Sequence, residues 1–417
     1  MASVSRNEMQ ATVNKVLWET KITDVHTHIY PKSFGGLLLW GVDELITYHY
    51  LIAETFRYVD MPYDKYFAMP KKAQAELIWQ TLFIERSPIS EAHRGILTVL
   101  SKLGLDVASR DLGKFRQYFS EKSVDEYMDI VFKTANVKEV VMTNDLFNTD
   151  EFAVWQSNPQ RDKRFHAALR IDPLLNLNEG AYARLREWGY AADTNLSGQS
   201  VDEIKRFLKE WIGRMGALYV AASLPPTFCI PEKSGRSRVV EECVIPVCRE
   251  MNKPFAMMIG VNKLVNPALG DAGDSSGMAD ISTVAYLCQK YPKNKFMVTM
   301  LSLENQHELA VCARKFGNLL VFGCWWFLNN PSIIDKMTRM RLELLGLSFV
   351  PQHSDARVLD QLIYKWEHSR RLIGGVLAEK YIDIMETGWQ FTEVEIRKDV
   401  EDLFSNNFWR FLNRTSV

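Results

Sequence analysis

Eight short runs of apolar and β-favouring residues, separated by stretches with helical spacing, constrain the fold of this chain more than any other feature. The runs begin near Ile22, Val137, Phe165, Leu218, Phe255, Lys295, Leu319 and Ser348. Short β-rich runs that alternate with helical stretches are typical of parallel strands joined by crossover helices. Eight of them predict an α/β fold, a (β/α)8 barrel of the TIM type, whose functional groups lie at the C-terminal ends of the strands.

The interval between the first two runs is the longest, at more than one hundred residues. Segments inside it, such as KKAQAELIWQTLFIERS and SEAHRGILTVLSKLGL, carry apolar residues at the spacing of amphipathic helices. We therefore predict three parts: an N-terminal segment with the first strand (1–30), a mostly helical insertion that caps the barrel mouth (31–130), and the remaining barrel with its closing helices (131–417). A barrel with an insertion commonly reaches this length as one unit.

Composition limits the kinds of partner that we expect. The chain is 47% hydrophobic and 24% charged, its formal net charge is −1, and no run of basic residues marks a nucleic-acid surface. We find neither the apolar core of a secretion signal nor about 18 consecutive apolar residues that could span a membrane. The six cysteines form no CxxC pair, which is typical of thiols in a reducing compartment. These features predict a cytoplasmic protein that acts on a small molecule; they leave the oligomeric state open and are compatible with a homo-oligomer.

Two short motifs at opposite ends of the chain predict a metal site. His26 and His28 lie two residues apart on the first run, so both side chains point to the same side of a strand. On the last run the same alternation aligns His353, Asp355 and Arg357. Because the first and last strands of a closed barrel are neighbours, His26, His28 and Asp355 are candidate ligands of one divalent ion.

Each half of this site also has an ordinary structural explanation. Two histidines in an HxH pair are as often plain strand residues as ligands, and Asp355 could cap the helix that follows it. The pairing of the two motifs with an eight-strand pattern favours ligation. We assign His353 to packing or to the support of a ligand rather than to the ligand set.

With these residues in place, the chain resembles the uronate isomerases (glucuronate isomerases) of the amidohydrolase superfamily, which join a first-strand HxH to an eighth-strand Asp on a distorted barrel. The resemblance covers nearly the whole chain, and its motifs are specific in this order rather than singly. They are His49-Tyr50, Arg170-Ile-Asp172, Leu269-Gly-Asp-Ala-Gly-Asp274, Phe322-Gly-Cys-Trp-Trp-Phe327, Asp355-Ala-Arg357 and Asn406-Asn-Phe-Trp-Arg410.

The chain departs from the family pattern at one position. Many uronate isomerases carry a histidine before the Ile-Gly of the fifth strand, where this chain has Met258. The fourth and sixth runs also end without histidine, lysine or cysteine, so the ligands of a second metal are missing. We expect one divalent metal ion, with zinc as the default and manganese or iron compatible with the same ligand types.

The resemblance implies an aldose-ketose isomerase that interconverts D-glucuronate with D-fructuronate and D-galacturonate with D-tagaturonate. Moving a proton from C2 to C1 through an enediol requires a base, a proton relay and stabilisation of oxyanion charge. By the resemblance, Asp355 acts as the base for the C2 proton, Arg357 holds the C2 and C3 oxygens, and Tyr50 donates to the C1 carbonyl.

The substrate-binding residues that the resemblance implies are His49, Tyr50, Arg170, Trp325 and Arg357. Without it, His49 and its tyrosine neighbour are as well explained by packing of the insertion, and Arg170 by an ion pair at a strand end. Of the adjacent Trp325 and Trp326, we expect one ring at most to face the barrel mouth and the other to pack outward.

Three other functions remain compatible with the same ligands. A mononuclear metal-dependent hydrolase could use them to activate water, although Tyr50 and Arg357 have no evident role there. A two-histidine, one-carboxylate iron oxygenase has the same ligand types but usually another fold. A non-catalytic sugar-acid binding protein could have kept the barrel without turnover.

Overall fold

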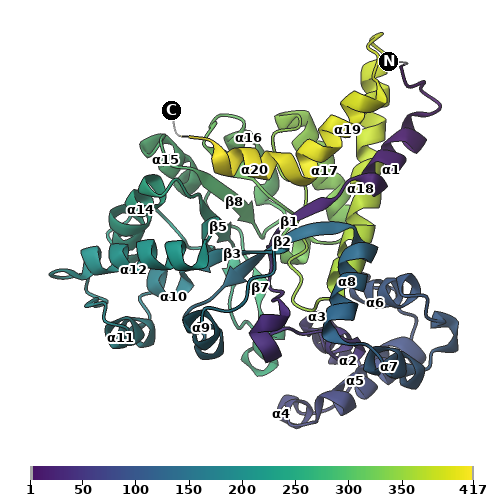
Figure 1. Ribbon diagram of the computed structural model, residues 1–417, viewed down its shortest axis with the longest axis horizontal. Coiled ribbons are helices and arrows are strands. Elements are labelled where there is room, and N and C mark those ends of the chain that lie inside the picture. The colour runs from purple at the N-terminus through teal and green to yellow at the C-terminus, as the bar shows by residue number, and fades with distance from the viewer. Residues whose placement is uncertain (1–2, 416–417) are drawn as a thin grey trace.

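A curled sheet of parallel strands forms the centre of the protein in the computed structural model, which describes residues 3–415 (Figure 1). The strands are β1 (Ile22–Thr27), β2 (Val137–Asn144), β3 (Phe165–Arg170), β4 (Val220–Leu224), β5 (Phe255–Ile259), β8 (Phe296–Met300) and β9 (Leu319–Val321). They follow one another in this order across the sheet, and every neighbouring pair is parallel. Each begins at or within two residues of a predicted run, so the predicted α/β barrel is confirmed.

The eighth run differs from the prediction, because it closes the ring without forming a regular strand. On one side Val350 bridges Phe322, just after β9. On the other side Asp355 N–H donates to His26 O at 3.1 Å, in β1. Two features prevent a continuous ladder: Pro351 has no N–H to donate, and Asp355 has a φ of 51°, outside the range of a strand. The barrel is distorted at this closing segment (348–357), which carries the candidate carboxylate.

Strand alternation divides the core into two layers. On β5, Phe255, Met257 and Ile259 pack outward with the helices, whereas Ala256 and Met258 point into the barrel. Each fully buried side chain of this size stabilises the fold by roughly 1.5–3 kcal/mol. The interior therefore holds a packed apolar core rather than a channel, and a site can form only at its ends.

Helices connect β1 to β2 through the long interval. They are η1 (Lys32–Leu37), α2 (Val42–Ile46), α3 (His49–Thr55), α4 (Tyr63–Phe67), α5 (Lys71–Trp79), η2 (Gln80–Ile84), α6 (Glu91–Lys102), η3 (Val107–Ser109), α7 (Leu112–Ser120) and α8 (Val124–Ala135). Most of them gather at the lower right of Figure 1, beside the lower end of α18 (Gln361–Met385). The amphipathic spacing explains α6, where Ser90 caps the N-terminus and Ile96, Val99 and Leu100 are buried.

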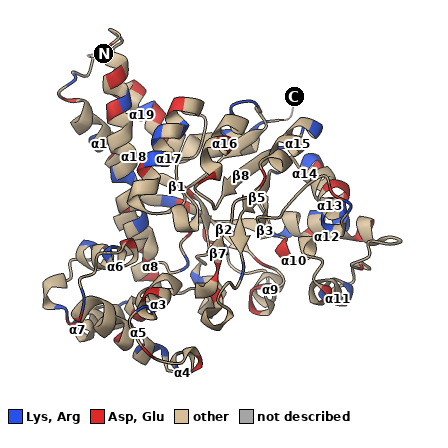
Figure 2. Cartoon of the chain, turned by 180° about the vertical axis from the view of Figure 1, so that it is seen from behind, with Lys and Arg blue, Asp and Glu red and all other residues tan. Residues whose placement is uncertain are grey.

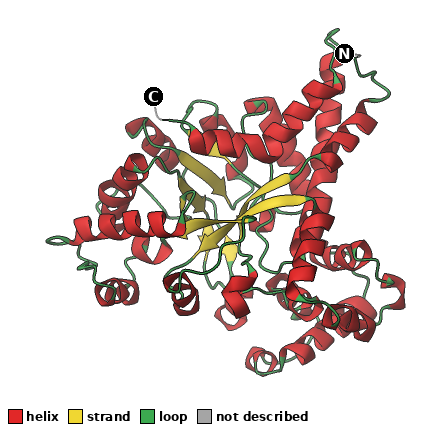
Figure 3. Cartoon of the chain, viewed as in Figure 1, coloured by secondary structure: helices red, strands yellow, loops and turns green. Residues whose placement is uncertain are grey.

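The remaining helices surround the sheet (Figure 3). After β2 the chain forms α9 (Thr149–Gln156), α10 (Asp172–Leu175), α11 (Glu179–Glu187), α12 (Ser200–Met215), α13 (Gly235–Arg238), η4 (Val239–Val244), α14 (Ile245–Glu250), η5 (Pro267–Gly273), α15 (Ser282–Lys290), α16 (Asn305–Ala313), η6 (Trp326–Leu328) and α17 (Pro331–Leu345). A short hairpin, β6 (Val261–Asn262) and β7 (Ser275–Ser276), follows β5.

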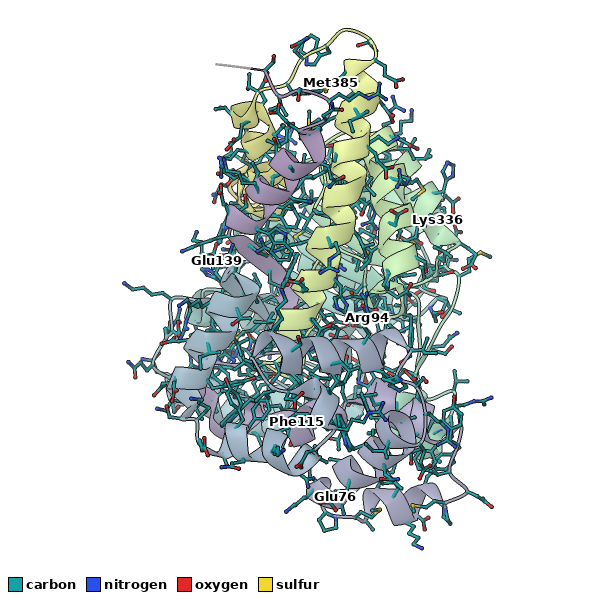
Figure 4. All side chains as sticks on the ribbon, turned by 90° about the vertical axis from the view of Figure 1, so that its right-hand side faces the viewer. Glu76, Arg94, Phe115, Glu139, Lys336 and Met385 are labelled. Atoms are coloured by element: carbon teal, nitrogen blue, oxygen red, sulfur yellow. The ribbon has the colours of Figure 1, made fainter. Side chains whose placement is uncertain are left out.

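The two ends of the chain pack against each other and against the barrel. Helix α1 (Met9–Glu19) contacts α18 and α19 (Glu393–Glu401), and η7 (Asp402–Asn406) leads into α20 (Asn407–Asn413). Phe408, Phe411 and Leu412 insert from α20 into the inner core. Figure 4 shows α18 running down the molecule from Met385 to the level of Arg94 on α6, so α18 joins the outer helices to the insertion.

The surface shows no preference for one sign of charge in the view of Figure 2, where basic and acidic residues are interspersed over the outer helices. None of the helices within residues 3–415 combines the length and the apolarity that crossing a membrane requires.

Candidate metal centre and active site

The three predicted metal ligands converge at the C-terminal end of β1. Asp355 Oδ1 lies 3.3 Å from Nε2 of His26 and 3.3 Å from Nε2 of His28. His26 is 1% exposed and Asp355 6%, while the His28 side chain is 17% exposed. Within residues 3–415, no other group of three histidine, cysteine or acidic side chains brings its ligand atoms within 4.8 Å of one another.

A hydroxyl behind His28 determines which of its ring nitrogens faces the site. Thr143 Oγ1 donates its hydrogen to Thr27 O at 2.7 Å and lies 3.3 Å from His28 Nδ1. Because this hydroxyl has one hydrogen, it must accept the Nδ1–H of His28. The Nε2 lone pair of His28 is therefore directed to the side where Asp355 lies.

The protonation states of these groups suit a cation. Burial lowers the pKa of His28 to about 3, which keeps this imidazole neutral. Burial alone raises the pKa of Asp355, but the two imidazoles that face the carboxylate hold that pKa well below its usual value. Imidazole and carboxylate groups are ligands that zinc, manganese and iron accept.

The distances between Asp355 Oδ1 and the two imidazole nitrogens also suit a single metal ion. Ligand atoms about 2.1 Å from one zinc ion in tetrahedral geometry lie about 3.4 Å apart, which is close to the 3.3 Å separations here. Among the described residues, neither ring nitrogen of the buried His26 forms a hydrogen bond, which is costly unless another partner is present. The residues that are present therefore fit one divalent metal ion.

A pocket opens beside these three residues. Its lining is His26, His28, His49, Arg170, Ser223, Met258, Val261, Lys263, Trp325, Trp326, Asp355 and Arg357. All of the site residues predicted from the sequence are in this lining except Tyr50. Ser223, Val261 and Lys263 were not predicted; each follows or ends a predicted strand, which is the signal that could have identified them.

Helix α3 brings His49 and Tyr50 to the pocket from the insertion. Their ring centroids lie 4.6 Å apart, and Tyr50 packs against the inner core of the barrel. Among the described residues, neither His49 Nε2 nor the Tyr50 hydroxyl forms a hydrogen bond, although both are buried. Burial holds the pKa of His49 well below its usual value and that of Tyr50 well above it. His49 is thus neutral, and Tyr50 keeps a hydrogen that it can donate.

Arg170 both forms an ion pair with Asp172 at the end of β3 and lines the pocket, the two alternatives that the sequence left open. It forms two hydrogen bonds to Asp172, from Nε at 3.1 Å and from Nη2 at 2.7 Å, and it also lines the pocket. Asp172 in turn accepts the N–H of Ser223 at 2.8 Å. The ion pair at the end of β3 therefore fixes a guanidinium at the pocket wall.

The hairpin loop after β5 supplies carboxylates to two further cations of the pocket. Arg357 Nη1 lies 3.2 Å from Asp271 Oδ2, in a pair that is largely exposed. Lys263 Nζ lies 2.6 Å from Asp274 Oδ2, and the ammonium is 5.8 Å from the centroid of the Trp326 ring. Val261 and Lys263 of this hairpin line the pocket, and η5, which lies between its two strands, contacts α3.

Both adjacent tryptophans line the pocket, so the expectation that one of them packs outward was wrong. Trp325 is 3% exposed and Trp326 7%. Strand β9 ends at Val321, and Trp326 has a φ of 48°, so the alternation of a strand no longer applies at these positions.

His353 and Met258 lie beside the site without adding a metal ligand to it. The His353 ring is fully buried, with its centroid 4.9 Å from that of His26, and it does not line the pocket. Met258 points into the barrel and forms part of the pocket wall. The chain therefore has an apolar group where the family pattern has an imidazole.

Comparison with solved structures identifies close and distant relatives. A uronate isomerase from Bacillus halodurans C-125 aligns with a TM-score of 0.97 and 55% sequence identity, covering 100% of this chain and 98% of that chain. A uronate isomerase from Thermotoga maritima has a TM-score of 0.79 and 16% identity, covering 98% of each chain. A glucuronate isomerase from Caulobacter crescentus has a TM-score of 0.77 and 14% identity, covering 99% of this chain and 95% of that chain.

At 16% and 14% identity, the last two comparisons show a shared fold. The chain matches no family model and no curated protein sequence. The first comparison, at 55% identity over both full lengths, agrees with the barrel and with the motifs read from the sequence. The chain therefore belongs to the uronate isomerase family and is an isomerase.

Proposed function

We propose that this enzyme interconverts D-glucuronate with D-fructuronate and D-galacturonate with D-tagaturonate. The proposal is carried by one observation: a single pocket gathers a buried carboxylate with two imidazoles, His26 and His28, and two guanidinium groups. Its substrates match the name of the Bacillus halodurans relative, a uronate isomerase.

The charges of the pocket suit a sugar acid. Arg170, Lys263 and Arg357 all line it, so a substrate carboxylate would meet cations at the wall and the rim. Trp325 and Trp326 add aromatic surface, which suits the C–H faces of a sugar. Arg170 keeps its bonds to Asp172, whereas the Arg357 side chain is paired, among the described residues, with the exposed Asp271.

His26, His28 and Asp355 would hold one divalent metal ion, with zinc as the default choice. When bound there, the ion supplies a positive charge that acidifies substrate hydroxyls and anchors the sugar. The chain contributes the geometry, because Thr143 orients the His28 ring and the closing segment places Asp355 between the two histidines.

In the reaction the C2 proton moves to C1, the C2 hydroxyl loses its proton, and the C1 carbonyl oxygen gains one, so the aldose becomes a ketose of equal composition. Asp355 is the base that accepts the C2 proton, because it is ionised and Oδ1 faces the imidazoles, which leaves Oδ2 for the substrate. Tyr50 donates to the C1 oxygen, and Arg357 stabilises the enediolate charge.

One experiment tests this reaction directly. The purified, metal-loaded protein is incubated with D-glucuronate in D2O, and the products are followed by NMR. Formation of D-fructuronate supports the proposal. Hydrolysis of esters or lactones without any ketose would indicate a hydrolase instead, and saturable binding without turnover would indicate a sugar-acid binding protein.

A further inference from the structure

The peptide groups on both sides of Ser354 are held by buried ionisable side chains. Asp24 Oδ1 accepts the N–H of Ser354 at 3.0 Å, and Lys365 Nζ donates to the carbonyl of Ser354 at 2.6 Å. Asp24 is fully buried and Lys365 is 3% exposed. Ser354 directly precedes Asp355, so these two contacts act on the main chain that carries the candidate carboxylate.

Asp24 links three parts of the fold. Its Oδ1 also accepts the N–H of His26 at 3.4 Å, and its Oδ2 accepts the indole N–H of Trp366 at 2.8 Å. One carboxylate thereby joins β1, the closing segment and α18. Losing such a group leaves several buried donors without an acceptor, which is more costly than losing one hydrogen bond.

Lys365 reaches the next peptide group, between Ser354 and Asp355, from α18. No carboxylate among residues 3–415 lies within ion-pair distance of its ammonium, and its one direct hydrogen bond goes to the Ser354 carbonyl. Asn329 Nδ2 donates to this carbonyl as well, at 3.3 Å. Neighbouring positions of α18 strengthen the attachment, since Gln361 Oε1 accepts the N–H of Arg357 at 2.8 Å.

These contacts explain an unusual backbone conformation. Asp355 has a φ of 51°, in the left-handed region that a residue with a Cβ rarely adopts. Such a conformation persists only where the surrounding structure fixes it. The conformation turns the Asp355 carboxylate toward His26 and His28, where Oδ1 lies 3.3 Å from both rings.

We propose that Asp24 and Lys365 are positioning residues, which hold the N–H and the carbonyl of Ser354, in the two peptide groups that flank this residue, and so keep Asp355 in its metal-binding orientation. Neither side chain lines the pocket, and both are buried against the main chain of the closing segment. The inference rests on the proposed metal site, but its readout is metal binding and is independent of turnover.

The chain offers a matched control at the opposite end of the barrel. Lys295 is 5% exposed, and its Nζ donates to the main-chain carbonyls of Leu412 and Arg414. Burial lowers the pKa of Lys295 to about 8, as it does for Lys365. Replacing either lysine by methionine removes a buried ammonium that holds main-chain carbonyls, but only Lys365 contacts the closing segment.

The experiment compares Lys365→Met, Lys295→Met and Asp24→Asn with the wild-type protein. Each metal-free protein is titrated with Co²⁺, and the visible absorption of the bound ion and the thermal midpoint are recorded. Loss of an outer partner of a metal site typically weakens metal binding about 10- to 100-fold. We expect that loss, with a changed Co²⁺ spectrum, for Lys365→Met and Asp24→Asn. Lys295→Met should keep the Co²⁺ affinity and spectrum of the wild type, although its thermal midpoint should fall about as much as that of Lys365→Met.

Several outcomes would overturn the inference. Lys365→Met with a wild-type Co²⁺ affinity and spectrum would do so, and so would equal losses of affinity in Lys365→Met and Lys295→Met. If Lys365→Met does not fold, the isosteric Asp24→Asn is the test. A wild-type Co²⁺ affinity and spectrum in that variant would then overturn the inference. A wild-type protein that binds Co²⁺ but converts no uronate would refute the proposed reaction while leaving this test of positioning intact.

Discussion

Thr143 Oγ1 lies 3.3 Å from Nδ1 of His28 while donating its own hydrogen to the carbonyl of Thr27. This relationship sets the tautomer of a candidate metal ligand, since the Thr27 carbonyl uses the only hydrogen of the Thr143 hydroxyl. The imidazole is thereby oriented before any ion arrives, which lowers the reorganisation that binding requires.

Thr143→Val should weaken metal binding about tenfold, because the valine side chain offers no acceptor to Nδ1–H of His28. Thr143→Ser keeps the hydroxyl and should remain within about threefold of the wild-type affinity. Zn²⁺ competition titrations measure both values. Equal affinities in the two variants would show that the hydroxyl does not orient the ring.

Asp355→Asn should reduce kcat by at least about 1,000-fold, because it removes both the base and a negative ligand. Met258→Leu, which keeps an apolar side chain of similar volume in the same pocket wall, should retain kcat within about tenfold. Steady-state kinetics with D-glucuronate give both numbers. A tolerant Asp355→Asn would remove this carboxylate from the mechanism.

Tyr50→Phe should lower kcat about 100-fold without lowering the thermal midpoint. Its hydroxyl is buried and forms no hydrogen bond with the described residues, so the fold loses nothing when the donor to the substrate is removed.

The control for that substitution is Tyr66→Phe. The Tyr66 hydroxyl is likewise buried without a hydrogen-bond partner among residues 3–415. The Tyr66 ring contacts Phe56 and Phe67, however, whereas the Tyr50 ring contacts His49, which lines the pocket. Its kcat should equal that of the wild type. A similar drop in both variants would mean that the loss at Tyr50 reflects packing rather than donation.

The lowered pKa of Lys295 should make the free energy of unfolding depend on pH. Burial lowers its pKa in the folded protein from 10.5 to about 8, so between these pH values the unfolded chain binds more protons than the folded chain. The unfolding free energy of the wild type, relative to Lys295→Met, should therefore rise as the pH increases from about 8 to about 10.5. Paired urea titrations at pH 7.5, 9 and 10 measure the difference, and a flat or falling difference contradicts the assignment.

The sequence predicted the parts of the barrel that depend on local pattern. Apolar β-rich runs located seven strands, and the two-residue spacing of His26 and His28 placed both rings on one side. The conformation of the closing segment could not be predicted from strand alternation. It depends on Pro351 and on the left-handed backbone of Asp355, which side chains distant in the sequence hold in place. The tryptophan pair was misjudged for the same reason, since the alternation of a strand stops before it.

The supports of the site were harder still to predict. Lys365 is one such support. It lies in α18, as does Arg370, which instead donates to the main-chain carbonyls of Leu17 and Thr20 before β1; both are buried because α18 packs against α1, α17 and the insertion helices α6 and α8. Nothing in the local sequence distinguishes them from surface positions. Long-range packing, which only the folded chain shows, decides that they are inside.

The closing segment also determines when this enzyme can become competent during synthesis. The histidines leave the ribosome early, but the carboxylate that completes their set comes after more than three hundred further residues. A growing chain that has made every strand through β9 therefore still lacks one of the three proposed ligands. The proposed metal site is complete only once Asp355 has emerged and has docked beside His26 and His28.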